Sequence, residues 1–106
     1  MSRSPGYGWV IDTDHIAESP EYSRVGTMGP SGIPTMIRED FERGAACLEF
    51  KRWRCKDGDG EVYYEGRYIG PGDERMFGPL QDFATPDAGA SDIEYLNTDT
   101  GQWEAL

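Results

Sequence analysis

The chain has 106 residues, of which 20 are Asp or Glu and 10 are Lys or Arg, so its formal net charge is −10. That length predicts one domain spanning residues 1–106, and an aromatic share of 12% supplies large rings for its core. No apolar run approaches the roughly 20 residues of a membrane-spanning helix, and the first residues predict neither a signal peptide nor an N-myristoylation site. The composition predicts a folded, cytoplasmic protein and excludes a membrane-embedded one.

The negative charge is concentrated in the second half of the chain. Residues 61–106 contain ten acidic and two basic residues, and no Lys or Arg follows Arg75. A field of this sign repels nucleic acid and phospholipid surfaces and attracts basic partners.

The first half of the chain predicts one strand, one long loop and one helix. Gly8–Asp12 is typical of a short strand. Asp14–Pro34 contains three Pro and three Gly, which predicts a mobile segment or a binding loop. Thr35–Arg43 predicts a short helix that buries Ile37 and Phe41 on one face.

A hairpin follows, with strands over Ala45–Lys56 and Glu61–Gly70 and a glycine-rich turn between them. The pattern allows two registers, which place Trp53 opposite either Tyr64 or Val62. In both registers Arg52, Arg54 and Lys56 share one face, and we expect Glu61 and Glu65 to neutralise them.

Both cysteines, Cys47 and Cys55, fall in the first strand of this hairpin. Eight residues of strand span about 26 Å, whereas a disulfide needs Cα atoms within about 7 Å. The sequence therefore predicts two free thiols, as is usual in a reducing compartment.

The second half predicts one helical turn at Gly78–Phe83, a loop at Pro86–Ala90 and a second hairpin. The strands of this hairpin are Asp92–Asn97 and Gln102–Leu106. A three-residue turn at Asp99-Thr100-Gly101 would place four residues on one face, Ile93, Tyr95, Trp103 and Ala105. It would place Glu94 and Glu104 together on the other.

These elements predict an α+β fold: a small antiparallel β-sheet of about five strands, with one short helix packed on it. We expect the buried rings to come mainly from Phe50, Trp53, Tyr64, Tyr95 and Trp103, with Ile93 beside them. Ile37 and Phe41 should contact these rings from the helix.

No sequence motif specifies catalysis or metal binding. Asp12, Asp14 and His15 could hold a metal ion or supply a general base, but surface turn residues are the favoured interpretation because His15 is the only histidine. Asp57–Glu61 does not fit the calcium-loop pattern, because with Gly60 at position 6 the first and twelfth positions are Cys55 and Gly66. A hairpin turn is the better explanation. The sequence predicts no catalytic residue, no metal and no cofactor.

Several segments resemble small acidic proteins encoded in actinobacteria and their phages. The residues that carry the likeness are Tyr63–Arg67, Phe77–Phe83, Pro86–Ala90, Ile93–Tyr95 and Gly101–Glu104, with Gly8–Asp12 and Gly26–Pro30 fitting more loosely. The resemblance covers about two-thirds of the chain. It implies an accessory or mobile-element role and assigns no activity, catalytic residue or binding residue.

The leading functional hypothesis is a non-enzymatic acidic protein that binds a basic, nucleic-acid-handling protein, as an inhibitor or nucleic-acid mimic. Eight carboxylates are the candidate partner-binding residues: Asp73, Glu74, Asp82, Asp87, Asp92, Glu94, Asp99 and Glu104. The alternatives are a ligand- or peptide-binding module that uses the 14–34 loop, and an enzyme or metal site built around Asp12, Asp14 and His15. A pocket beneath the loop would favour the binding module.

Overall fold

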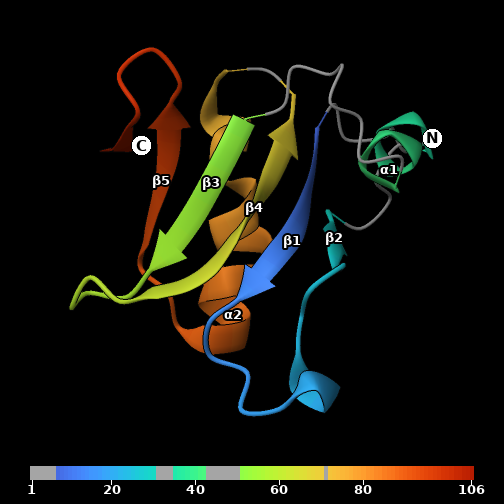
Figure 1. Cartoon of the computed structure of the whole chain (residues 1–106). Helices are drawn as coiled ribbons and strands as arrows, with labels where there is room; N and C mark the ends of the chain where they lie inside the picture. The colour runs from blue at the N-terminus through green and yellow to red at the C-terminus, as the bar shows by residue number, and fades with distance from the viewer. Residues whose placement is uncertain (1–6, 31–34, 43–50, 71) are drawn as a thin grey trace.

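Six antiparallel strands form one open sheet in the order β2-β1-β4-β3-β5-β6. The computed structural model describes residues 7–30, 35–42, 51–70 and 72–106. The strands are β1 (Gly8–Asp14), β2 (Met28–Gly29), β3 (Lys51–Lys56), β4 (Val62–Ile69), β5 (Asp92–Asn97) and β6 (Gln102–Ala105). One bent helix lies across one face of the sheet (Figure 1), so the predicted α+β class is confirmed.

The bent helix joins three helical segments and provides the other half of the core. These are η2 (Glu74–Phe77), η3 (Pro79–Ala84) and α2 (Thr85–Ala88). Met76, Leu80 and Ala84 recur every fourth residue and are all buried, so one stripe of the helix faces the sheet. The sequence predicted one helical turn at Gly78–Phe83 and a loop at Pro86–Ala90, so the helical stretch is longer at both ends than predicted. Pro79 begins η3, where its missing N–H costs nothing.

Alternating side chains on the central strands build the inner half of the core, beneath the bent helix. On β3, Trp53 and Cys55 are buried while Arg54 and Lys56 point to the outer face. The sheet residues of this core are Trp9, Ile11, Trp53, Cys55, Tyr64, Tyr68, Ile93 and Tyr95. Cys55 is a free thiol whose burial raises its pKa. Cys47 and Phe50 lie outside the described residues.

Helix α1 (Thr35–Glu42) packs on the outer face of the sheet, opposite the bent helix. Phe41 is buried against Val10 there, and Ile37 packs beside them. The expectation that Ile37 and Phe41 contact the central rings was therefore wrong. Val10 lies between Trp9 and Ile11 and points the other way, which provides a second, smaller core on the outer face.

The first hairpin pairs Trp53 with Gly66 and Cys55 with Tyr64, so both predicted registers were wrong. The connection is longer than a two-residue turn, because the Asp57 carboxylate accepts the backbone N–H groups of Asp59 and Glu61. A register shift after Cys55 absorbs the extra length. The observed register differs from each predicted register by an even number of residues. The same side chains of β3 and β4 are therefore buried and exposed as predicted.

The second hairpin pairs Asn97 with Gln102 and Leu96 with Trp103, so its predicted register was also wrong. The Asn97 side-chain oxygen accepts the N–H groups of Asp99 and Thr100, which supports a four-residue connection. A slip of one residue moves every side chain of a strand to the other face. Trp103 accordingly lies on the outer face, where the guanidinium of Arg54 is 4.4 Å from its ring centre.

Candidate functional site

The eight predicted partner-binding carboxylates do not gather on one face. Asp73, Glu74, Asp82 and Asp87 lie along the bent helix and at its start. Asp92 and Glu94 lie on the outer face of the sheet, opposite Lys56 and Arg54. Asp99 is in the β5–β6 connection, and Glu104 shares the inner face with Tyr95.

Six of these carboxylates have hydrogen-bond or ion-pair partners among the described residues. Asp73 caps η2 and pairs with Arg75 at 3.0 Å. Asp82 accepts hydrogen bonds from the Tyr7 hydroxyl at 2.9 Å and from the Trp9 indole at 3.1 Å. Asp87 accepts a hydrogen bond from Tyr64, and Glu94 pairs with Arg54 and Lys56. Asp92 and Glu104 accept weaker hydrogen bonds, from the Ser91 hydroxyl at 3.4 Å and from the Asn97 side-chain amide at 3.3 Å. Some of the acidic residues therefore stabilise the fold itself, through hydrogen bonds and ion pairs within the chain.

Glu94 pairs with two cations on the outer face of the sheet. Its carboxylate lies 2.7 Å from the Arg54 Nε and 3.4 Å from the Lys56 Nζ. The sequence had assigned Glu61 and Glu65 to these cations, and it had placed Glu94 beside Glu104. Glu65 does lie opposite Arg54 on β4, but the ion pairs of Arg54 and Lys56 are made with Glu94. The placement of Glu94 beside Glu104 was wrong, because the two side chains point to opposite faces of the sheet.

This cluster should contribute stability that depends on pH. Burial raises the pKa of Glu94, but the hydrogen bond and charge of Arg54, with Lys56, outweigh it, so the net pKa lies below its ordinary value of 4.5. A lowered pKa adds stability above the ordinary value, and that stability is lost as pH falls through the lowered pKa. We expect Glu94→Gln to reduce the free energy of unfolding by about 1 kcal/mol at pH 7 and by clearly less at pH 3. Urea denaturation at both pH values measures this.

Asp92→Asn is the matched control, because Asp92 is an exposed carboxylate on the same strand and face. It should change stability little at either pH. An equal loss at pH 7 and pH 3 for Glu94→Gln would show that the ion pairs are not its cause.

Asp12, Asp14 and His15 do not converge on one site. Asp12 forms a bidentate pair with Arg67 at 2.8 and 2.9 Å, and the His15 Nε2 contacts Glu65. Within the described ranges, no group of three or more His, Cys, Asp or Glu could hold a metal ion. Each of the three side chains therefore has a local role of its own.

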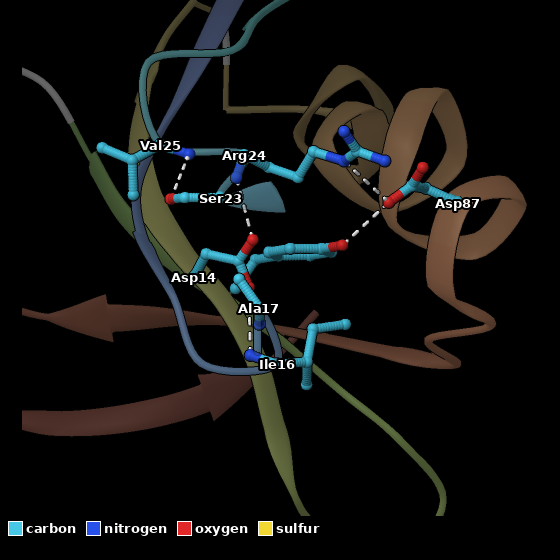
Figure 2. A network of polar contacts seen from close by, with 8 residues as sticks. Asp14, Ile16, Ala17, Ser23, Arg24, Val25 and Asp87 are labelled. Carbon is cyan, nitrogen blue, oxygen red and sulfur yellow. Dashed lines mark hydrogen bonds and ion pairs between the residues drawn. The ribbon is translucent and has the colours of Figure 1, made fainter. Parts of the chain in front are cut away.

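Asp14 organises the β1–β2 loop (residues 15–27). One oxygen of its carboxylate accepts the N–H groups of Ile16 and Ala17 at 3.0 Å, and the other accepts the N–H of Arg24 at 2.9 Å. Figure 2 shows these bonds joining the two ends of the loop. The loop then returns to β1 through a hydrogen bond from the Gly26 N–H to the Ile11 carbonyl at 2.8 Å. One carboxylate thus gives a defined shape to a segment without regular sequence periodicity.

Asp87 ties this loop and the sheet to the end of the bent helix. The Tyr64 hydroxyl donates to its Oδ2 at 2.8 Å, and the Arg24 Nε lies 3.5 Å from the same oxygen (Figure 2). Burial raises the pKa of Tyr64, and the neighbouring Asp87 raises it further. The phenol therefore remains a hydrogen-bond donor to Asp87 throughout the physiological pH range.

A pocket of about 330 Å³ opens between the β1–β2 loop and α2, and we call it the loop pocket. Its walls are Asp14, Ile16, Ala17, Glu18, Tyr22, Arg24, Tyr64 and Asp87. An adjoining hollow shares Asp14, Ala17 and Glu18 with it. The loop pocket combines three carboxylates with one guanidinium and two phenol rings, and the Tyr22 side chain is 67% exposed.

Sequence reasoning marked the 14–34 loop as a binding candidate and Asp87 as a surface carboxylate, but it did not predict which residues would line a pocket between them. Tyr64 was assigned only to the core, and Arg24 was given no role. The four residues that join at this point, Asp14, Arg24, Tyr64 and Asp87, belong to four segments of the chain. No local sequence pattern predicts that these four residues come together in the folded chain.

Comparison of the chain with protein-family models, curated proteins and solved structures finds no match. The resemblance to small acidic proteins of actinobacteria and their phages stays a prediction. No helix in the described part of the chain is long and apolar enough to cross a membrane.

Proposed function

We propose that the protein is a non-enzymatic binding module that takes a basic segment of a partner protein into the loop pocket. The observation that carries this proposal is the lining of the pocket, in which Asp14, Glu18 and Asp87 outnumber Arg24 and lie beside two tyrosines. Concave sites with a few placed polar groups are the usual form of a ligand site.

Glu18 is the carboxylate best suited to receive a cation. The Asp14 oxygens already accept three backbone N–H groups, and Asp87 is held by Tyr64 and Arg24. Glu18 is exposed and forms no ion pair with any described residue. The exposed Tyr22 ring on the same pocket offers a face to an arginine or lysine side chain.

The remaining acidic surface supports this role at longer range. A net charge of −10 attracts a basic partner and speeds its approach, even where the individual carboxylates make no contact with it. A free, buried thiol at Cys55 is consistent with a reducing compartment such as the cytoplasm. That the partner handles nucleic acid, and that the protein belongs to a phage or mobile element, remain predictions from the sequence.

A pair of charge-matched variants tests the proposal. The probe is a fluorescein-labelled tetra-arginine peptide, with tetra-glutamate as the negative control, and binding is measured by fluorescence anisotropy at 50 and 200 mM salt. We expect Glu18→Gln to weaken tetra-arginine binding about tenfold, because a hydrogen bond to a charged group contributes about 1.5–3 kcal/mol. Glu74→Gln removes the same charge at the far end of the bent helix and should change binding less than twofold.

Amide chemical shifts measured during the same titration locate the peptide. The changes should centre on Ala17, Glu18 and Tyr22. If both variants weaken binding equally, or if the shift changes spread over all acidic surfaces, the attraction is general and the loop pocket is not the site.

A further inference from the structure

Strand β6 presents a free backbone edge among the described residues, because it is the last strand of the sheet. The Leu106 N–H donates to the Ile93 carbonyl at 3.2 Å, which identifies this pair as hydrogen-bonded. Hydrogen-bonded and non-bonded pairs alternate along an antiparallel ladder. In the observed register Glu104 is therefore bonded to β5, while the N–H and C=O groups of Trp103 and Ala105 point away from the sheet.

A second pocket, of about 400 Å³, lies beside this edge on the face that carries the bent helix. Its walls include Met76, Tyr95 and Leu106, with Lys51 and Glu104 also on the lining. The Tyr95 hydroxyl donates a hydrogen bond to the Met76 carbonyl at 2.7 Å, so the part of Tyr95 that faces the pocket is its apolar ring. Leu106 is 45% exposed at the same place.

We propose that an extended segment of a partner protein adds to β6 as a further strand and inserts a large apolar side chain into this pocket. Backbone bonds to Trp103 and Ala105 would supply affinity, and the pocket would supply specificity, as in other cases of strand addition. The proposal does not depend on the loop pocket, which is lined by none of the same residues.

The charge on β6 argues against a second copy as the occupant. Two copies of β6 use the free backbone groups of both Trp103 and Ala105 only in the antiparallel register that bonds Trp103 of one copy to Ala105 of the other. That register places the two Glu104 side chains directly opposite each other on one face. Like charges directly opposed destabilise a strand pair, and each copy carries a net charge of −10. A partner segment without an acidic residue at that position avoids this repulsion.

Two substitutions at one position test the backbone contact. Ala105→Pro removes an N–H that β5 does not use, so the sheet keeps its own bonds while the edge is blocked. Ala105→Val keeps that N–H. The probe is a peptide selected on the wild-type chain from a phage-displayed library of random octapeptides and then labelled with fluorescein. We expect Ala105→Pro to weaken its binding at least tenfold, and Ala105→Val to change it less than threefold.

Two further measurements make the outcome decisive. The amide signals of Trp103 and Ala105 in the wild-type chain should shift and become protected from exchange when the peptide binds. N-methylation of the peptide at alternate amides should abolish binding to the wild-type chain, which tests the contact even if Ala105→Pro fails to fold. Failure to select any binder, or equal binding by the two variants, overturns the proposal. A dimer detected by ultracentrifugation and lost in Ala105→Pro would assign the edge to a second copy.

Discussion

Gly66→Ala should reduce the free energy of unfolding by about 3 kcal/mol or more, or prevent folding. A Cβ at this position would lie 1.9 Å from the Val10 carbonyl oxygen and 2.6 Å from the Trp53 Cζ2. Neither the Val10 carbonyl nor the Trp53 ring can move away easily. Val10 belongs to β1, which pairs with β4, and the Trp53 ring is held by an indole hydrogen bond to the Arg67 carbonyl at 3.0 Å.

The glycine is therefore the position over which the Trp53 ring lies, and it helps to define how β3 pairs with β4. Gly58→Ala is the matched control, since a Cβ there meets no atom within 4 Å and its backbone is not left-handed. Urea denaturation of both variants, followed by tryptophan fluorescence, measures the difference. Similar midpoints for the two variants would mean that the ring does not cover Gly66 as described.

Phe41→Ala should cost about 3 kcal/mol, near the lower end of the range for a buried aromatic ring. Phe41 is only 3% exposed, and it covers Val10 on the outer face of the sheet. The guanidinium of Arg67 lies 5.5 Å from the centre of its ring, so the substitution also removes a cation–π contact. Only a few apolar residues surround Phe41 on this face, so we expect a loss of stability near the lower end of that range.

Glu42→Ala on the same helix is the control, because Glu42 is exposed and alanine favours helix. It should leave the free energy of unfolding within about 0.5 kcal/mol of the parent. A loss below about 1 kcal/mol for Phe41→Ala would mean that α1 does not dock on the sheet. Binding of the tetra-arginine peptide should change less than twofold in both variants, since neither Phe41 nor Glu42 lines the loop pocket.

Local pattern in the sequence determined the class of fold and the two faces of the central strands. The alternation along Trp53, Arg54, Cys55 and Lys56 predicted which side chains are buried, because successive side chains of a strand point to opposite faces. The turn glycine at position 101 was also predicted, and it adopts the expected left-handed conformation with φ of 73°. These features depend on neighbours within a few residues.

Tertiary structure decided the registers, the bent helix and the pockets. The position of β3 against β4 depends on the fit of Trp53 over Gly66 and on the capped turn at Asp57, and a turn dipeptide alone specifies neither. A connection longer by one residue reversed the faces of β6 and moved Trp103 out of the core. The helix over residues 74–88 persists past its glycine and prolines because its apolar stripe has the sheet to cover.

The loop pocket exists only because one aspartate, Asp14, joins the ends of a loop while another, Asp87, joins that loop to Tyr64. The sequence marked the loop as a binding candidate and Asp87 as a surface carboxylate, but it did not connect them. Contacts between residues so distant along the chain are set by how the elements pack. Local periodicity therefore predicted the elements, whereas the packing of the folded chain decided the candidate site.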